Sequence, residues 1–214
     1  MSATGCWYNV MKQIVFILLL VFGSIDNQPD TSLIDSRSNI QQRDPSVYYR
    51  FGKINVDGAK AFTSEEILKI AGIKSNAFAS PAVVETAAEA IRRAYLNRGH
   101  VRVQVKVAAE YEVISPRSKM GLVGISININ EGAVFQLRRL EFAGNEATRD
   151  KIVRRKVLLE EGTTYNQDLM DKSLRNLNNL KQFETLTMAD VEISTDEQQK
   201  IVDLIFHLKE IKRK

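Results

Sequence analysis

The 214-residue chain has one cysteine and two histidines, so it offers few side chains that bind metals or act as nucleophiles. The cysteine, Cys6, lies ahead of an apolar run near the start of the chain. Removal of that leader would leave no thiol, which excludes disulfides, thiolate catalysis and cysteine-ligated metals from the mature chain. His100 and His207 fall in different halves of the chain, which argues against a shared metal or a histidine-based triad. We therefore expect no enzyme activity, no metal and no cofactor.

The chain also lacks a strong excess of one charge. Its formal net charge is +4, but Lys12 near the start and Lys212, Arg213 and Lys214 at the end carry four positive charges. The remainder is close to neutral, whereas a nucleic-acid-binding domain is expected to show a basic face within its folded part. We therefore expect no nucleic-acid partner.

The longest apolar run, IVFILLLVFGS at residues 14–24, is about half as long as the roughly 20 residues that a membrane-spanning helix needs. It ends in glycine and serine, small residues that a signal peptidase accepts. We interpret residues 1–24 as an export signal, with an uncleaved signal anchor as the alternative. Residues 25–47 are polar, contain two prolines and show no sustained periodicity, which predicts a flexible linker.

Residues 48–132 predict a unit of strand, helix, helix, strand and strand. The first helix begins at a Thr-x-x-Glu capping box, Thr63 to Glu66, and the second begins at a Ser-Pro pair. Apolar and polar residues alternate over 101–107 and again over 125–129, which predicts the second and third strands.

Residues 133–211 repeat this order. The first strand ends at Gly144, Thr148 begins a short helix that carries Val157, and Asn166 caps the second helix. Strands are predicted over 183–193, with a bulge before Val191, and over 202–208. The glycines of the two first turns lie 144 − 58 = 86 positions apart, as expected for one repeated unit. The predicted structural turn residues are Gly58, Gly144, Asn145 and Gly162.

Several motifs resemble a POTRA domain, the polypeptide-transport-associated module of outer-membrane β-barrel assembly factors. In the second unit they are FAGN at 142–145, EEGTTYNQ at 160–167, SLRNLNNLKQFE at 173–184 and VDLIFHLKE at 202–210. The first unit shows the resemblance in YLNRGHVRVQV and ININEG. The second unit is most similar to the last POTRA domain before the barrel in BamA-like proteins. One departure is Lys181, where the family usually has glycine.

The resemblance implies an α+β fold: two tandem β-α-α-β-β domains, each a three-stranded sheet packed on two helices. In the family the second strand lies at a sheet edge, where unpaired N–H and C=O groups can template another strand. The polar residues that alternate along that strand could equally form a solvent-exposed face, on which lysine opposes edge-to-edge aggregation. The candidate polypeptide-binding residues are Val101, Arg102, Val103, Gln104, Val105, Lys106, Val107, Glu184, Thr185, Leu186, Thr187 and Met188.

The function implied is a non-catalytic periplasmic binding module at the outer membrane of a Gram-negative-type bacterium. Its partners would be unfolded outer-membrane polypeptides or a separate β-barrel or assembly protein, with membrane association through these partners and no small-molecule substrate. Alternatives are a signal-anchored periplasmic scaffold of the cell-division type and a cytoplasmic RNA-binding α+β domain. Four residues follow Glu210, too few for a transmembrane barrel, which predicts either a POTRA protein without a barrel or a truncated product.

Overall fold

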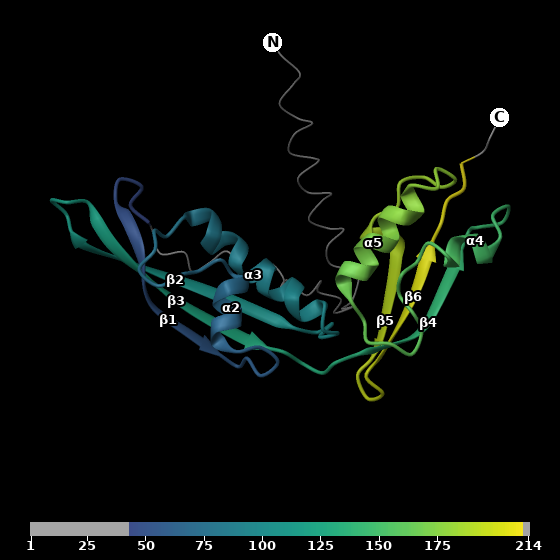
Figure 1. The fold of residues 1–214 in the computed structure, drawn as a ribbon, viewed down its shortest axis with the longest axis horizontal. Helices are drawn as coiled ribbons and strands as arrows, with labels where there is room; N and C mark the ends of the chain where they lie inside the picture. The colour runs from purple at the N-terminus through teal and green to yellow at the C-terminus, as the bar shows by residue number, and fades with distance from the viewer. Residues whose placement is uncertain (1–42, 212–214) are drawn as a thin grey trace, which may run out of the picture. The chain divides into compact units, whose positions relative to one another are not determined.

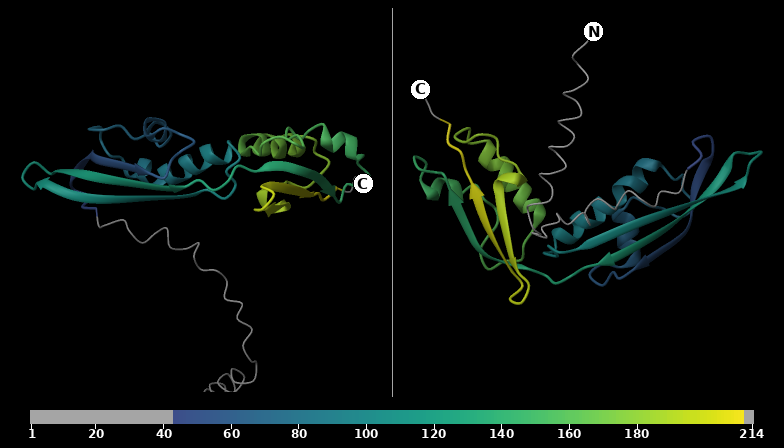
Figure 2. Two further views of the ribbon diagram at one scale, coloured as in Figure 1. Left: turned by 90° about the horizontal axis from the view of Figure 1, so that it is seen from below. Right: turned by 180° about the vertical axis from the view of Figure 1, so that it is seen from behind.

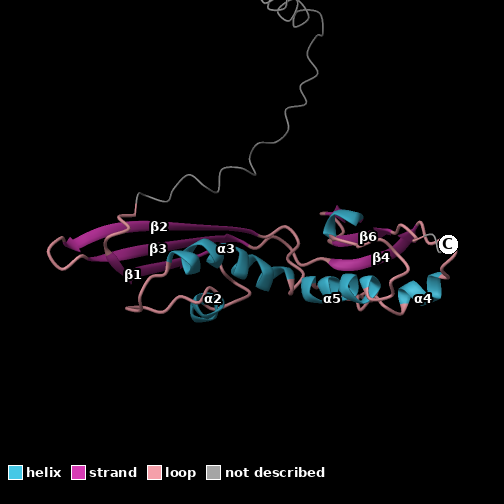
Figure 3. Cartoon of the chain, turned by 90° about the horizontal axis from the view of Figure 1, so that it is seen from above, coloured by secondary structure: helices cyan, strands magenta, loops and turns pink. Residues whose placement is uncertain are grey.

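A computed structural model describes residues 43–211 of the chain. They form two three-stranded sheets, each with helices on one face (Figure 1 and Figure 3). Within this range no helix combines the length and the apolar character needed to cross a bilayer. The predicted signal at 1–24 and most of the predicted linker lie outside the described residues.

The first domain follows the predicted order of elements. Its central strand is β3, which runs parallel to β1 and antiparallel to β2, so β1 and β2 are the two edges. The elements are β1 (Tyr48–Asp57), α2 (Ser64–Ile70), α3 (Pro81–Leu96), β2 (Gln104–Ser115) and β3 (Met120–Asn130).

The second domain repeats this topology around the central strand β6, with β4 and β5 at the edges. A short 3-10 helix, η3 (Met188–Asp190), precedes β5. The other elements are β4 (Gln136–Ala143), α4 (Asp150–Arg154), α5 (Gln167–Asn178), β5 (Val191–Asp196) and β6 (Ile201–His207). The α+β fold class and the two tandem β-α-α-β-β domains predicted from the sequence are therefore confirmed.

Each domain has its own core between sheet and helices. On the central strands every second side chain is buried, as in Ile125 and Ile127 of β3 and Leu204 and Phe206 of β6. Full burial of such a side chain stabilises a fold by about 1.5–3 kcal/mol. The period-two pattern read from the sequence thus marks the core face of both sheets.

Two of the predicted helix caps are confirmed. The Thr63 hydroxyl accepts from the Glu66 N–H (3.2 Å) while the Glu66 carboxylate accepts from the Thr63 N–H (2.8 Å). Asn166 Oδ1 accepts from the Leu169 N–H (3.0 Å). Ser80 occupies the cap position of α3, but its side chain makes no capping hydrogen bond.

The short helix of the second domain differs from its prediction. It was expected to start at Thr148 and to carry Val157, but α4 spans only Asp150–Arg154. The backbone N–H of Thr148 instead donates to the Glu210 carboxylate, which holds this residue in the preceding loop.

Candidate polypeptide-binding edges

The edge formed by β1 is paired with the domain's own chain over Tyr49–Phe51. The segment before α3 runs beside β1, where the Phe51 N–H donates to the Ala77 carbonyl and the Asn76 N–H donates to the Phe51 carbonyl, both at 3.0 Å. The Ala79 N–H donates to the Tyr49 carbonyl at 2.9 Å. These bonds occupy backbone groups that an added strand would need.

The second domain closes its β4 edge in the same way. Ahead of α5, the Gly162 N–H donates to the Leu137 carbonyl, and the Leu137 N–H donates to the Thr163 carbonyl at 2.8 Å. The Tyr165 N–H donates to the Phe135 carbonyl at 3.1 Å. Each domain thus covers the first part of the edge of its first strand with the segment that leads into its second helix.

The opposite edge of the first sheet is long and open. β2 pairs with β3 from Gln104 to Ser115. Among residues 43–211, no backbone hydrogen bond outside the sheet involves a β2 residue. Of the predicted binding residues, Gln104 to Val107 lie in this strand, which continues eight residues further, from Ala108 to Ser115.

The start of the predicted strand was wrong. Val101 and Arg102 form a turn and Val103 precedes β2 without strand pairing, because the Val103 N–H donates to the His100 carbonyl at 3.2 Å. The Arg102 guanidinium donates to the Thr195 hydroxyl of the second domain at 2.7 Å. Val101 packs against the second core, so Val101 and Arg102 belong to the junction between the domains, whereas Val103 is buried in the first core.

The prediction that residues 184–188 form an edge strand of the second sheet was also wrong. Glu184 to Thr187 adopt no strand, and Met188 begins η3. The Asn178 side chain accepts from the Leu186 N–H (2.8 Å) and donates to the Leu186 carbonyl (2.9 Å). A side chain on α5 thus occupies both backbone groups of Leu186, and neither is free for the sheet.

A capping box adds to this disruption. The Asp190 carboxylate accepts from the Thr187 N–H at 2.8 Å, while the Thr187 hydroxyl accepts from the Ala189 N–H at 3.3 Å. The Val191 N–H then donates to the Met188 carbonyl. The edge strand β5 starts only at Val191 and has six residues, against twelve in β2.

The junction between the domains is made by the end of α3 and the start of α5. Arg93 forms ion pairs with Asp168 (2.7 Å) and Asp171 (2.6 Å). The Asn97 side chain accepts from the Asp168 N–H (2.9 Å), which helps to cap α5 across the junction. The hydrogen bond from Arg93 is the main cause that lowers the pKa of Asp168.

The turn glycines behave as predicted. Gly58 and Gly144 have φ of +81° and +86°, and a Cβ at these positions would collide with the carbonyl oxygens of Ile129 and Leu208. Gly162 also has a positive φ, +84°, but open space surrounds its Cα. Both a left-handed backbone and a close approach therefore require glycine at the first two turns.

A repeated carboxylate clamp was missed from the sequence. Two residues beyond Ile129, the Glu131 carboxylate accepts from the N–H groups of Lys60 (2.6 Å) and Ala61 (2.7 Å). Partial burial acts to raise the pKa of Glu131, but these hydrogen bonds hold it below its ordinary value. The equal offset of a glutamate after each third strand is the signal that could have revealed the clamp.

In the second domain Glu210 takes the same position, two residues beyond Leu208. Its carboxylate accepts from the N–H groups of Ala147 (2.9 Å) and Thr148 (2.7 Å). The hydrogen bond from Ala147 is the main cause that lowers the pKa of Glu210. Asn145, predicted as a turn residue, donates from its side chain to the Thr148 carbonyl at 3.1 Å in the same loop.

The histidines lie apart, one in each domain. His100 is buried, with its ring edge-on to Tyr95, and His207 pairs with Glu192 at 3.3 Å. Between residues 43 and 211, no three histidine, cysteine or acidic side chains are grouped so that they could hold a metal ion.

Curated proteins that are similar to this chain include outer membrane protein assembly factors. A "Putative outer membrane protein assembly factor" of Treponema pallidum is 24% identical over 162 residues, which cover 76% of this chain and 18% of the relative. The "Outer membrane protein assembly factor BamA" of Buchnera aphidicola is 24% identical over 162 residues, which cover 76% and 25%. The chain thus spans a quarter or less of the length of these two relatives.

Solved structures share the fold. The BamA POTRA3-5 fragment of Haemophilus influenzae matches with a TM-score of 0.60 and 21% identity, over 76% of this chain and 61% of that one. BamA of Haemophilus ducreyi lacking POTRA domains 1–3 matches with a TM-score of 0.61 and 20% identity, over 76% and 30%. The POTRA family model, described as "Surface antigen variable number repeat", matches residues 49–132 and again residues 135–211. Since these two matches cover most of the sequence, the chain belongs to the POTRA family and contains two tandem POTRA domains.

Proposed function

We propose that the chain is a non-catalytic module that binds extended polypeptides by strand addition to β2. The observation that carries this proposal is the difference between the two edges of the first sheet. The chain's own backbone pairs with β1 over Tyr49–Phe51 and leaves only Gly52–Asp57 of that edge open, whereas the described residues leave the outer side of β2 without backbone partners over all its twelve residues. A long open edge binds an extended chain through main-chain hydrogen bonds.

The side chains of β2 favour a partner with alternating character. Val105, Val107 and Tyr111 are partly buried and pack against the first core. Gln104 and Glu110 are exposed on alternate positions. A strand added beside β2 would extend both faces, so apolar side chains on one face and polar ones on the other would suit it. Strands of outer-membrane barrels have this alternation.

The partners proposed are therefore unfolded outer-membrane polypeptides or a separate β-barrel assembly protein. The names of the relatives, outer membrane protein assembly factors, support this choice. We propose the periplasm as the place of action, in keeping with the export signal expected at residues 1–24. A signal-anchored scaffold remains the alternative. It predicts a chain in inner-membrane fractions with residues 1–24 intact, whereas the proposal predicts outer-membrane association through partners.

The decisive experiment uses a client peptide rather than a variant of the protein. A barrel-strand peptide is prepared in two forms, N-methylated at all odd or at all even positions, and each is titrated against the isotope-labelled chain. An added strand pairs through alternate residues only, so one methylated form should lose binding and the other should retain it. The backbone amide chemical shifts of Gln104–Ser115 should change on binding, and the peptide should bind with a Kd of roughly micromolar to millimolar.

Other outcomes would reject strand addition. Equal binding of both methylated peptides would show that backbone hydrogen bonds do not hold the client. Shifts confined to the helix face around Glu85 and Glu89 would place the client on α3 instead of the sheet edge. Shifts along Val191–Asp196 alone would assign the site to the shorter edge of the second domain.

A further inference from the structure

The first sheet ends in a group of exposed apolar side chains, which we call the end patch. It consists of Tyr48, Phe78, Val113, Ile114 and Met120. Their exposed fractions are 67%, 66%, 42%, 58% and 42%, in that order. Soluble proteins rarely expose several large apolar side chains close together, and such patches mark interaction sites.

Strand register shows that three of these side chains are neighbours on one face of the sheet. Tyr48 pairs with Met120 across β1 and β3, and Phe78 pairs with Arg50, two residues further along β1. Since Tyr49 between them is buried against the core, Tyr48 and Arg50 point to the helix-free face of the sheet. Tyr48, Phe78 and Met120 therefore share that face.

The remaining two members lie where β2 ends. Val113 pairs with Gly121, which is directed toward buried Tyr49, so Val113 lies on the core-side face. Ile114 sits in a register shift before Ser115. The turn that joins β2 to β3 projects beyond the helices of the first domain (Figure 1 and Figure 2). The end patch thus surrounds a projecting hairpin tip, a shape that meets a broad surface more readily than it encloses a small ligand.

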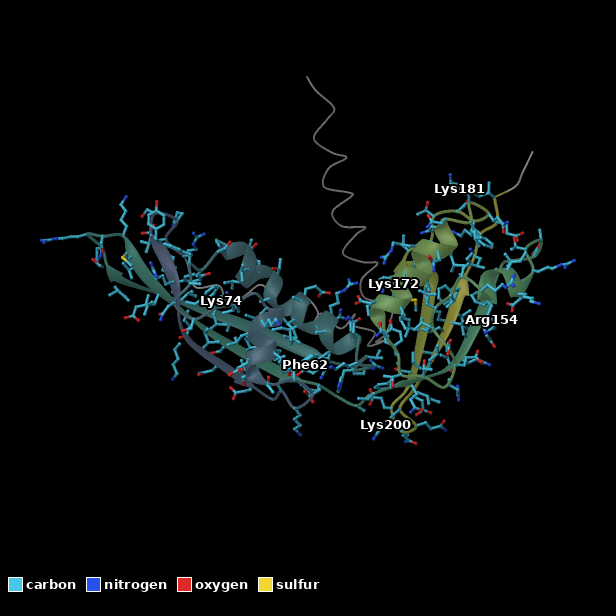
Figure 4. The ribbon with its side chains drawn as sticks, in the orientation of Figure 1. Phe62, Lys74, Arg154, Lys172, Lys181 and Lys200 are labelled. Atoms are coloured by element: carbon cyan, nitrogen blue, oxygen red, sulfur yellow. The ribbon has the colours of Figure 1, made fainter. Side chains whose placement is uncertain are left out.

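Cations surround the end patch. Arg50 stacks over the Phe78 ring at 4.8 Å. Arg117 and Lys119 are exposed in the hairpin turn, and Lys74, labelled in Figure 4, is exposed on the loop that carries Phe78. Residues 71–80 and 115–120 contain no acidic side chain. The acids close to this end of the sheet include Glu112, which precedes Val113, and Asp44, whose pKa is lowered chiefly by hydrogen bonds from Ser46 and further by Lys119.

We propose that the end patch docks the first domain on an anionic lipid surface. Aromatic and aliphatic side chains beside lysine and arginine are the combination that binds the interface of a bilayer. The exposed side chains of Lys74, Arg117 and Lys119 complement the negative charge of such a surface.

This docking goes beyond strand addition and does not depend on it. The end patch lies at the Ser115 end of β2, whereas Gln104 begins the strand at the opposite end. Lipid contact at one end would leave the Gln104 end of the edge accessible. The domain would then present its open edge close to the membrane surface.

The test places a probe in the end patch, because the apolar run at 14–24 can bind vesicles by itself. The full chain carries Cys6→Ser and Ile114→Cys, labelled with an environment-sensitive fluorophore. The matched control carries Gln198→Cys, also exposed but in the turn before β6. Each is mixed with phosphatidylcholine vesicles with and without phosphatidylglycerol. Emission shift and quenching by nitroxide-labelled lipid are recorded.

Anionic vesicles should shift and quench the probe at position 114 but not the probe at 198. Lys74→Ser and Arg117→Ser should each weaken the response about fivefold, as expected for one surface cation. Phe78→Ser should weaken it further, with an unchanged melting midpoint showing that the fold is intact. Equal responses at both positions, no response at 114, or a response without vesicles that depends on protein concentration would each overturn lipid docking, the last in favour of a protein interface.

Discussion

The two domains share one topology but present different open edges. The first sheet offers β2, twelve residues long and paired on one side only, whereas the second offers β5, half that length. The difference arises outside the sheets, because the Asn178 side chain binds the backbone of Leu186 and a capping box follows it. Side chains outside a sheet can therefore decide how much of its edge is available to a partner.

The largest effect should come from the turn glycines that the domains have in common. Gly58→Ala and Gly144→Ala each place a Cβ against a carbonyl oxygen in addition to forcing an unfavourable φ. We expect each to lower the free energy of unfolding by about 3 kcal/mol. Denaturant unfolding gives this value directly. Gly162→Ala is the matched control, because its Cβ would meet open space, and it should cost only about 1 kcal/mol.

The short edge of the second domain can be tested by removing the side chain that disrupts it. Asn178→Ala leaves the partly buried backbone of Leu186 without two hydrogen bonds, which should cost about 2 kcal/mol. Amide exchange should become faster over residues 183–190. Asn176→Ala is the control, since it loses one exposed hydrogen bond to the Lys156 carbonyl, and it should change stability by less than about 1 kcal/mol. Equal costs for both variants would show that Asn178 has no special role.

A smaller gain is expected at the end of α5. Lys181 has a φ of +53°, a conformation that favours glycine, and the first domain has Gly99 with φ +84° after its own second helix. Lys181→Gly should therefore raise the free energy of unfolding by about 1 kcal/mol. Lys200→Gly, with φ +55° in the turn before β6, provides a second test of the same effect. A loss of stability at Lys181 would indicate that the lysine side chain makes a stabilising contact.

The smallest effect should be the pH dependence of the Glu210 clamp. The folded-state pKa of Glu210 lies below its ordinary value of 4.5, so its contribution is present above pH 4.5 and is lost as pH falls through the lowered pKa. Glu210→Gln should thus be less stable than the unmodified chain at pH 7. The difference in denaturant midpoint should shrink as the pH falls below 4.5. A difference that stays constant down to pH 3 would show that ionisation of this carboxyl is unimportant.

Local chemistry in the sequence determined much of this protein. The order of elements, the capping box at Thr63 and the cap at Asn166 all depend on residues close together in the chain. Alternation of apolar side chains marked the central strands because one face of each sheet must be buried. The POTRA motifs then placed both units in one family.

Tertiary structure alone decided where the edges begin, end and stay open. Apolar residues at Phe183, Leu186 and Met188 looked like a strand, but backbone N–H groups of Leu186 and Thr187 donate to the Asn178 and Asp190 side chains and hold that segment in another conformation. β2 continues to Ser115 because β3 supplies partners along its length, and β1 is closed over Tyr49–Phe51 by the segment before α3. Such hydrogen bonds depend on tertiary contacts that local sequence preferences do not encode. The sequence therefore could not predict which part of each sheet edge is open to a partner.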